Sequence, residues 1–147
     1  MIASATSPAA TRISEAHIAE LAASGVGPEA AAAAGIWTEA DPARVAELLR
    51  WRGPADELGP CLVYPYLSLT GAPTGYHRLK PTSPRMLGRG DREPRAAKYE
   101  APVGEPHRPY LPPGTRGVIP DPQIPLVITE GEKKALAADA AGIPAIG

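Results

Sequence analysis

The stretch from Leu126 to Gly147 constrains the fold of this chain more than any other. It opens with an apolar, β-branched run that predicts a strand buried on both faces, and Glu130-Gly131 interrupts the run. Residues 132–141 are strong helix formers apart from one aspartate, and Gly142 stands where a left-handed C-cap belongs. A second apolar strand begins at 143–146. The stretch predicts a strand–helix–strand unit with Glu130 at the carboxyl end of the first strand, where open α/β sheets bind ligands.

Two motifs in this stretch are typical of a known family. The first reads Val127-Ile-Thr-Glu-Gly-Glu-Lys-Lys-Ala135, and after one helix the second reads Gly142-Ile-Pro-Ala-Ile-Gly147. Together they resemble the opening of a TOPRIM domain, the metal-dependent catalytic module of bacterial-type primases, topoisomerases and some nucleases. The Glu-Gly-Glu-Lys-Lys-Ala form is most similar to primase-like proteins of plasmids, phages and other mobile elements. In those proteins an uncharacterised N-terminal region precedes the module.

The resemblance implies a catalytic role and a magnesium site for Glu130. In the family this glutamate is a general acid or base in nucleotidyl transfer and helps to set up the Mg²⁺ site. For Gly131 we expect either a backbone contact to a phosphate or a role in the turn. A later strand of the family carries an Asp-x-Asp pair that binds the metal, and this sequence contains no such pair. A lone carboxylate cannot hold a hard cation. We therefore expect half a site, from a truncated gene, a split gene or a partial sequence, and no polymerase activity from the chain alone.

The first part of the chain predicts a small helical leader. Residues 1–12 are small and polar and are expected to be disordered, and residues 13–52 are expected to be helical. Capping residues and N-terminal prolines predict three short helices, at 14–25, 28–35 and 41–49. Trp37 and Trp51 flank the third helix and are the expected anchors that pack the three together. The alternatives are a docking module and a leader that stabilises the later part of the chain, and the second is favoured.

After a linker at 53–59, residues 60–112 change to strand-like periodicity. Residues 61–67 and 76–80 predict two strands of an antiparallel hairpin that spans 61–80. Pro65 marks the first strand as an edge strand or a bulged one. In the second strand Tyr76, Arg78 and Lys80 share one face, which is therefore basic. Residues 81–97 form a Pro-, Gly- and Arg-rich loop that is expected to be flexible.

The net charge of −1 hides a basic segment. Between Tyr76 and Lys98, two acidic residues face seven positive ones: Arg78, Lys80, Arg85, Arg89, Arg92, Arg95 and Lys98. Lysine and arginine neutralise phosphates, and Tyr76 and Tyr99 are able to stack on unpaired bases. A solvated charged loop is the alternative, and nucleic-acid binding is favoured.

The order of hairpin, basic loop, Lys98-Tyr99 and Pro-rich return is similar to the catalytic core of bacterial replicative primases just before their TOPRIM segment. This resemblance implies an α/β region, and it carries over residue by residue only to Arg78, Lys98 and Tyr99 as phosphate- or template-binding residues. Lys133 and Lys134 lie in the first helical turn, where cations oppose the macrodipole. Binding a phosphate and facing solvent are equally weighted for these two lysines.

Several functions are excluded or not expected. Cys61 is the only cysteine, which rules out an internal disulfide and a multi-cysteine zinc ribbon, and His17, His77 and His107 have no ligand spacing. There is no Walker phosphate loop, so an ATPase or a helicase would be a partner on the same or a neighbouring chain. No signal peptide or membrane-spanning run is present in the sequence, and a cytoplasmic location without membrane contact is expected.

The sequence thus predicts an α+β chain: a helical leader, a basic hairpin-containing region at 60–112, and an incomplete TOPRIM unit at 125–147. The leading hypothesis is the N-terminal portion of a primase-like TOPRIM protein in the DNA replication of a mobile element. Its expected partners are single-stranded DNA or RNA and nucleotides, with Mg²⁺ in the complete protein and no zinc. The alternatives are a non-catalytic single-stranded nucleic-acid-binding module or remnant, and a fragment of a TOPRIM nuclease.

Overall fold

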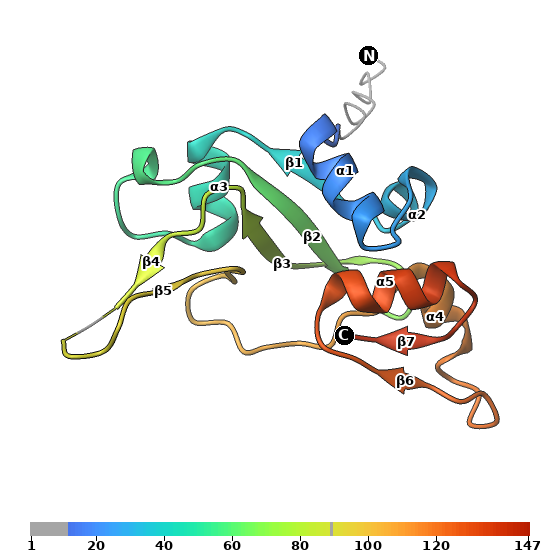
Figure 1. The fold of residues 1–147 in the computed structure, drawn as a ribbon. Coiled ribbons are helices and arrows are strands. Elements are labelled where there is room, and N and C mark those ends of the chain that lie inside the picture. The colour runs from blue at the N-terminus through green and yellow to red at the C-terminus, as the bar shows by residue number, and fades with distance from the viewer. Residues whose placement is uncertain (1–11, 89) are drawn as a thin grey trace, which may run out of the picture.

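The computed structural model describes residues 12–88 and 90–147. Figure 1 labels the α-helices, which are α1 (Glu15–Ala23), α2 (Pro28–Ala33), α3 (Pro42–Leu49), α4 (Pro113–Val118) and α5 (Glu132–Ala140). A short 3-10 helix, η1 (Ala55–Glu57), follows α3. The strands are β1 (Trp37–Glu39), β2 (Cys61–Leu67), β3 (Pro73–Pro81), β4 (Met86–Leu87), β5 (Arg95–Ala96), β6 (Val127–Ile128) and β7 (Ala145–Ile146). Helices together with an antiparallel sheet are consistent with the predicted α+β class.

β2 is the central strand of an antiparallel three-stranded sheet in the order β1-β2-β3. β3 pairs with it to form the hairpin expected from the sequence, and the register shifts between Pro65 and Leu67. The proline therefore lies at an irregularity, which is the second of the two expected alternatives. β2 is not an edge strand at Cys61 to Val63, where β1 covers its other side, but that pairing ends before Pro65. β1 was not expected, since a three-residue strand is too short to show alternation.

The helix boundaries depend on local capping. The Ser14 hydroxyl accepts a hydrogen bond from the amide of His17 at 3.3 Å, and Asp41 accepts one from the amide of Ala43 at 2.9 Å. α2 and α3 each have proline in the first turn, where the missing N–H costs nothing. Gly142 has a φ of 81°, the left-handed conformation predicted after the last helix.

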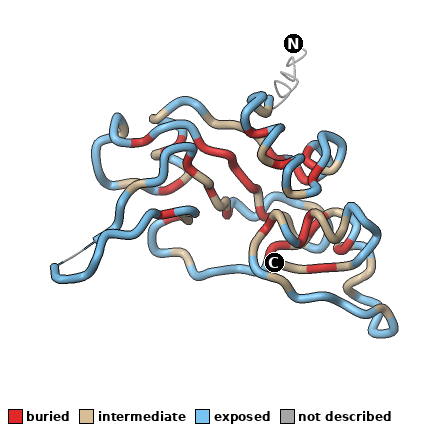
Figure 2. Tube along the Cα trace, in the orientation of Figure 1, coloured by how far each residue is buried: buried red, intermediate tan, exposed pale blue. Residues whose placement is uncertain are grey.

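The two faces of the sheet belong to two separate core clusters. Leu62, Tyr64 and Tyr66 point to one face, where they pack with residues of α1, α2 and α5. Val63 and Leu79 point to the other face, where they pack with α3. Figure 2 shows the resulting run of buried residues along β2. The sheet therefore separates α3 from the other two helices of the leader.

The two tryptophans do not join the three leader helices, so that expectation is wrong. Trp37 lies on β1, packs against the α3 cluster, and meets His77 edge to face at 5.6 Å between ring centroids. Trp51 packs in the same cluster and lies under the guanidinium of Arg85 at 4.1 Å. α1 and α2 instead bury Leu21 and Ala31 in the cluster on the opposite face, which also contains Tyr64 and Tyr66.

The basic loop at 81–97 contains a short hairpin. β4 and β5 pair antiparallel, with Met86 opposite Ala96 and Leu87 opposite Arg95. All four residues are exposed, and the hairpin projects from the body of the molecule in Figure 1. The segment that was expected to be an irregular loop therefore contains a pair of short antiparallel strands.

β6, α5 and β7 form a parallel strand–helix–strand unit, as the sequence predicted. The expectation that the first strand is buried on both faces is wrong, because Val127 is 45% exposed and Ile128 is 80% exposed. In the described part of the chain only β7 pairs with β6, and the core contacts of the unit are made by Ala135, Leu136 and Ala145. The TOPRIM arrangement as a whole requires more strands than this pair. Among the described residues, no helix has both the length and the apolar character needed to cross a bilayer.

Candidate functional site

Glu130 lies at the carboxyl end of β6 with its side chain 97% exposed. The amide of Thr129 donates to the carbonyl of Ile146 at 2.9 Å, which fixes the end of the strand immediately before it. Gly131 then turns the chain into α5 with a φ of 82°, a conformation that favours glycine. The nearest cation is Lys134, whose Nζ lies 3.8 Å from Oε2 of Glu130. This carboxylate is therefore held at the edge of the parallel pair and is open to a ligand.

Glu132, two residues further along, has the opposite environment. It is 1% exposed, and its Oε1 accepts a hydrogen bond from the Tyr66 hydroxyl at 2.5 Å and lies 3.4 Å from Nη1 of Arg78. Its Oε2 is buried with no hydrogen-bond partner among the described residues. Burial and the neighbouring carboxylate raise the pKa of Tyr66 far above its usual value, so the phenol keeps its proton as donor. The sequence did not point to this residue, since a glutamate in the first helical turn looks like an ordinary solvent-facing one.

Arg78 is held between that carboxylate and an aromatic ring. Its guanidinium lies 5.1 Å from the centroid of Tyr99, a cation–π contact. Burial lowers the pKa of Arg78, but the Glu132 carboxylate outweighs burial and the pKa lies above its ordinary value. Burial and the same carboxylate raise the pKa of Tyr99 to about 12. The structure thus brings together two of the predicted binding residues, Arg78 and Tyr99, and leaves Arg78 31% exposed.

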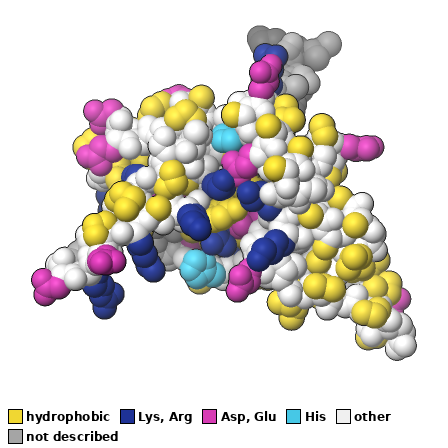
Figure 3. All heavy atoms as spheres, viewed as in Figure 1, with side chains coloured by type: hydrophobic (Ala, Val, Ile, Leu, Met, Phe, Trp, Pro, Cys, Tyr) yellow, Lys and Arg dark blue, Asp and Glu magenta, His cyan; other side chains and the backbone are white. Residues whose placement is uncertain are grey.

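Lys80 and Lys133, the next two predicted residues, share one acceptor. Both Nζ atoms donate to Oε1 of Glu20 on α1, and the distance from Lys133 is 2.8 Å. Burial raises the pKa of Glu20, but hydrogen bonds from Lys133 and Lys80 outweigh burial, and the pKa lies below its ordinary value. On the face of the molecule that Figure 3 shows, Lys and Arg side chains gather over the middle, around apolar atoms. Three basic residues on or near β3, Arg78, Lys80 and Lys133, are therefore already paired with carboxylates.

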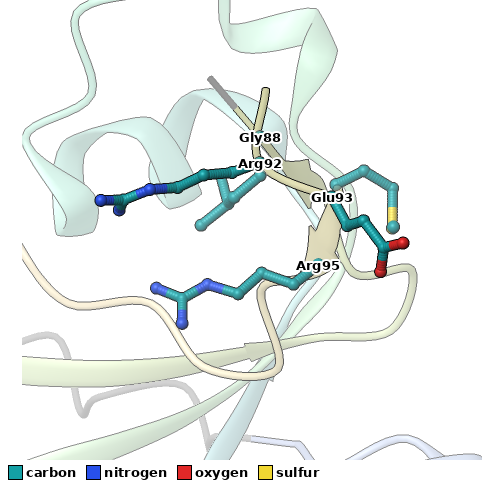
Figure 4. Close-up of a pocket in the computed structure, with 6 residues that line it drawn as sticks. Gly88, Arg92, Glu93 and Arg95 are labelled. Carbon is teal, nitrogen blue, oxygen red and sulfur yellow. The ribbon is translucent and has the colours of Figure 1, made fainter. Parts of the chain in front are cut away.

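The β4–β5 hairpin has cations of a different kind. Arg92 and Arg95 line a hollow with Gly88, and Figure 4 shows their guanidinium groups reaching to the same side while Glu93 points to the other. In the described part of the chain neither arginine forms a salt bridge, and the same holds for the exposed Lys98. Arg89, the seventh cation of the predicted segment, lies outside the described residues. The hairpin therefore presents charge that is free to meet an anion.

The carboxylates of the described residues do not fit a magnesium ion. Three or more His, Cys, Asp or Glu side chains come together at no place among residues 12–88 and 90–147. Glu130 is a single exposed carboxylate with a lysine beside it, and Mg²⁺ binding needs several oxygen ligands. Burial raises the pKa of the Cys61 thiol to about 12, which disfavours the thiolate that binds metals. We therefore assign no step of a reaction to a metal held by these residues.

Comparison with known proteins gives one match. The model of a domain of unknown function, DUF3854, matches residues 116–147, which include β6, Glu130, α5 and β7. No curated protein matches the chain, and no solved structure matches it. The matched family has no assigned activity, so it marks the C-terminal strand–helix–strand unit as a recurring module without stating its chemistry.

Proposed function

We propose that this chain is the N-terminal portion of a primase-like TOPRIM protein that binds single-stranded nucleic acid during replication of a mobile element. The observation that carries the proposal is the position of Glu130. An almost fully exposed carboxylate closely follows β6 of a parallel strand–helix–strand unit, at the edge where α/β sheets take their ligands. The TOPRIM resemblance of residues 127–135 and 142–147 supports the same assignment.

In this proposal Glu130 is the general acid or base of nucleotidyl transfer. An exposed side chain at a strand end is able to reach a hydroxyl proton of a bound nucleotide, which is the geometric requirement for this role. Magnesium would supply charge neutralisation at the phosphates in the complete protein, and the remaining ligands are expected on an Asp-x-Asp strand. This sequence has no Asp-x-Asp pair, so we expect no primer synthesis from the chain by itself.

The binding part of the proposal depends on unpaired cations of the β4–β5 hairpin and of the residues just after it. Arg92, Arg95 and Lys98 are exposed and have no carboxylate partner among the described residues. Phosphate contacts by such side chains release counterions, and the affinity for a strand then falls as salt rises. Tyr99 lies on the same segment, next to Lys98, and offers a partly exposed ring for stacking.

The test is fluorescence anisotropy of a labelled single-stranded oligonucleotide, titrated with the chain at several salt concentrations. We expect Arg92→Gln with Arg95→Gln to reduce the slope of log affinity against log salt by about 1.4, since each phosphate contact contributes about 0.7 for a single strand. The matched control is Arg44→Gln with Arg50→Gln, which removes two exposed arginines that are paired with glutamates elsewhere. An unbound oligonucleotide at low salt would contradict the proposal. Arg78→Ala is a poor probe, because it also removes the cation beside the buried Glu132.

The second candidate is a non-catalytic single-stranded nucleic-acid-binding module. The exposed hairpin arginines favour it as much as they favour the primase-like protein. A module of this kind needs no metal site, and the described residues form no cluster of potential metal ligands. Reading the source DNA past codon 147 separates the two. If the frame encodes an Asp-x-Asp strand, Glu130→Gln in that protein should abolish primer synthesis and leave strand binding unchanged. If that substitution leaves synthesis intact, the catalytic role is refuted; a TOPRIM nuclease would instead degrade the template strand.

A further inference from the structure

Two lysines from distant parts of the sequence converge on one carboxylate oxygen. Lys80 of β3 and Lys133 of α5 both donate to Oε1 of Glu20, which α1 contributes. The three side chains are 25%, 20% and 29% exposed, so the junction is neither buried nor free in solvent. α1 and α5 pack on one face of the sheet that contains β3, and these three elements thus bring their charged side chains to one point.

The charges at this point do not cancel. Two ammonium groups face one carboxylate, which leaves one positive charge, and the remaining cation of this face of β3, Arg78, already has Glu132 as its partner. A phosphate group also has anionic oxygens that accept from ammonium donors, and it has more of them than a carboxylate. The carboxylate of Glu20 thus accepts from the same two ammonium groups that are suited to a phosphate.

We propose that Lys80 and Lys133 form a binding site for a phosphate group of a single strand or of a nucleotide, and that Glu20 is an internal competitor for it. The proposal rests on the proposed function and adds the site and its regulation. Glu20 lies on the partly exposed surface of α1, and rotation of its side chain about χ1 and χ2 removes the carboxylate without moving the helix. Phosphate binding then replaces one anion by another, so the two lysines keep an anionic partner throughout.

Two other roles are conceivable for Glu20, and each predicts a different change in affinity from that of an internal competitor. If Glu20 held the lysines in the geometry that a phosphate requires, its removal would weaken binding. If it only fastened α1 to β3 and α5, its removal would lower stability and leave affinity unchanged. An internal competitor, in contrast, opposes binding, so its removal tightens binding. The sign of the change in affinity therefore separates the three roles.

The experiment measures the affinity of purified wild-type and variant chains for two probes. The first probe is a labelled oligothymidylate, read by anisotropy, and the second is ATP, read by calorimetry; the pair distinguishes a strand phosphate from a nucleotide phosphate. We expect Glu20→Gln to bind one of them about threefold to tenfold more tightly, because it releases two lysines from ion pairs of modest strength. Glu15→Gln is the matched control, since it removes the same charge from the exposed start of α1 and should change affinity less than about twofold.

A second variant keeps the test decisive if Glu20→Gln does not fold. Lys80→Ala with Lys133→Ala should lower the salt slope of oligothymidylate binding by about 1.4. Where Glu20→Gln does fold, adding it to this double variant should have no further effect. If the wild-type chain binds a probe and Glu20→Gln binds it equally tightly or more weakly, Glu20 is not a competitor, and the proposed function still stands. Wild-type binding that survives loss of both lysines would overturn the site itself. If the wild-type chain binds neither probe, the proposed function and the site both fail.

Discussion

The hydroxyl of Tyr66 donates a 2.5 Å hydrogen bond to Oε1 of Glu132, although 66 residues separate the two in sequence. Tyr66 belongs to the central sheet and Glu132 opens α5, so this bond joins the strand–helix–strand unit to the rest of the molecule. Because both partners are buried, the bond is made in a low dielectric, where a hydrogen bond to a charged group is strong and an unmade one is costly.

Loss of this hydrogen bond should destabilise the protein. We expect Tyr66→Phe to lower the free energy of unfolding by roughly 1.5 to 3 kcal/mol, since it leaves a buried carboxylate with fewer partners. Tyr64→Phe is the matched control: Tyr64 is fully buried on the same face, and its hydroxyl has no partner among the described residues, so removal should be neutral or stabilising. Urea denaturation of the three proteins measures the difference. Equal effects of the two substitutions would show that the bond to Glu132 contributes nothing.

Thr115 is the second link that the structure reveals. Its hydroxyl donates to Oδ1 of Asp139 at 2.7 Å and accepts from the amide of Ala145 at 3.0 Å, so one buried side chain connects α4, α5 and β7. We expect Thr115→Val to lower the free energy of unfolding by about 2 kcal/mol, because it leaves a buried amide unpaired.

Thr115→Ser keeps both hydrogen bonds and loses one methyl group, so it should cost only about 0.8 kcal/mol. Thermal unfolding of the two variants beside wild type tests the ranking. If serine were as destabilising as valine, packing of the methyl group would matter as much as the two hydrogen bonds of the hydroxyl.

The ion pairs of Glu20 should make stability depend on pH in the acid range. Burial raises the pKa of Glu20, but Lys133 and Lys80 outweigh it, and the pKa in the folded state lies below the ordinary value of 4.5. A depressed carboxyl pKa stabilises the fold above the unfolded value, and this contribution is lost as pH falls through the folded value. We expect Glu20→Gln to be less stable than wild type at neutral pH, by about 1 kcal/mol.

The difference between the two proteins should begin to shrink as the pH drops below 4.5 and should vanish below the lowered pKa of folded Glu20, where both side chains are uncharged. Denaturation midpoints measured at a series of pH values give the comparison. A difference that stayed constant down to the acid limit would mean that Glu20 acts by packing and not by charge.

Local signals predicted the elements of this fold well. The caps at Ser14 and Asp41, the glycine at Gly142 and the β2–β3 hairpin each depend on residues close in sequence, and the structure has them where the pattern indicated. The strand–Glu130–helix–strand unit was predicted for the same reason. Such signals are readable because capping and turn chemistry act over a few residues.

Long-range pairing was not predictable in the same way. Nothing near Lys80 in the sequence indicates that Glu20 neutralises it, and nothing near Glu132 indicates that Tyr66 and Arg78 bury it. These contacts arise because the sheet places α1 and α5 on one face, a tertiary arrangement with no periodicity of its own. The basic segment therefore looked uniformly available for binding, whereas its cations divide into paired ones around β3 and unpaired ones on the β4–β5 hairpin.

Of the two glutamates in the Glu130-Gly131-Glu132 motif, only Glu132 should lower the stability of the protein when it is replaced by glutamine. Glu130→Gln changes a side chain that is 97% exposed, and we expect the urea midpoint to be unchanged. Glu132→Gln keeps an acceptor for Tyr66 but removes the charge beside Arg78, so it should cost roughly 1 to 3 kcal/mol. Circular dichroism during urea denaturation, run on both variants, measures this contrast between an outward and an inward carboxylate. Equal stability of the two variants would be incompatible with the buried position of Glu132, and a loss at Glu130 would mean that its carboxylate also supports the fold.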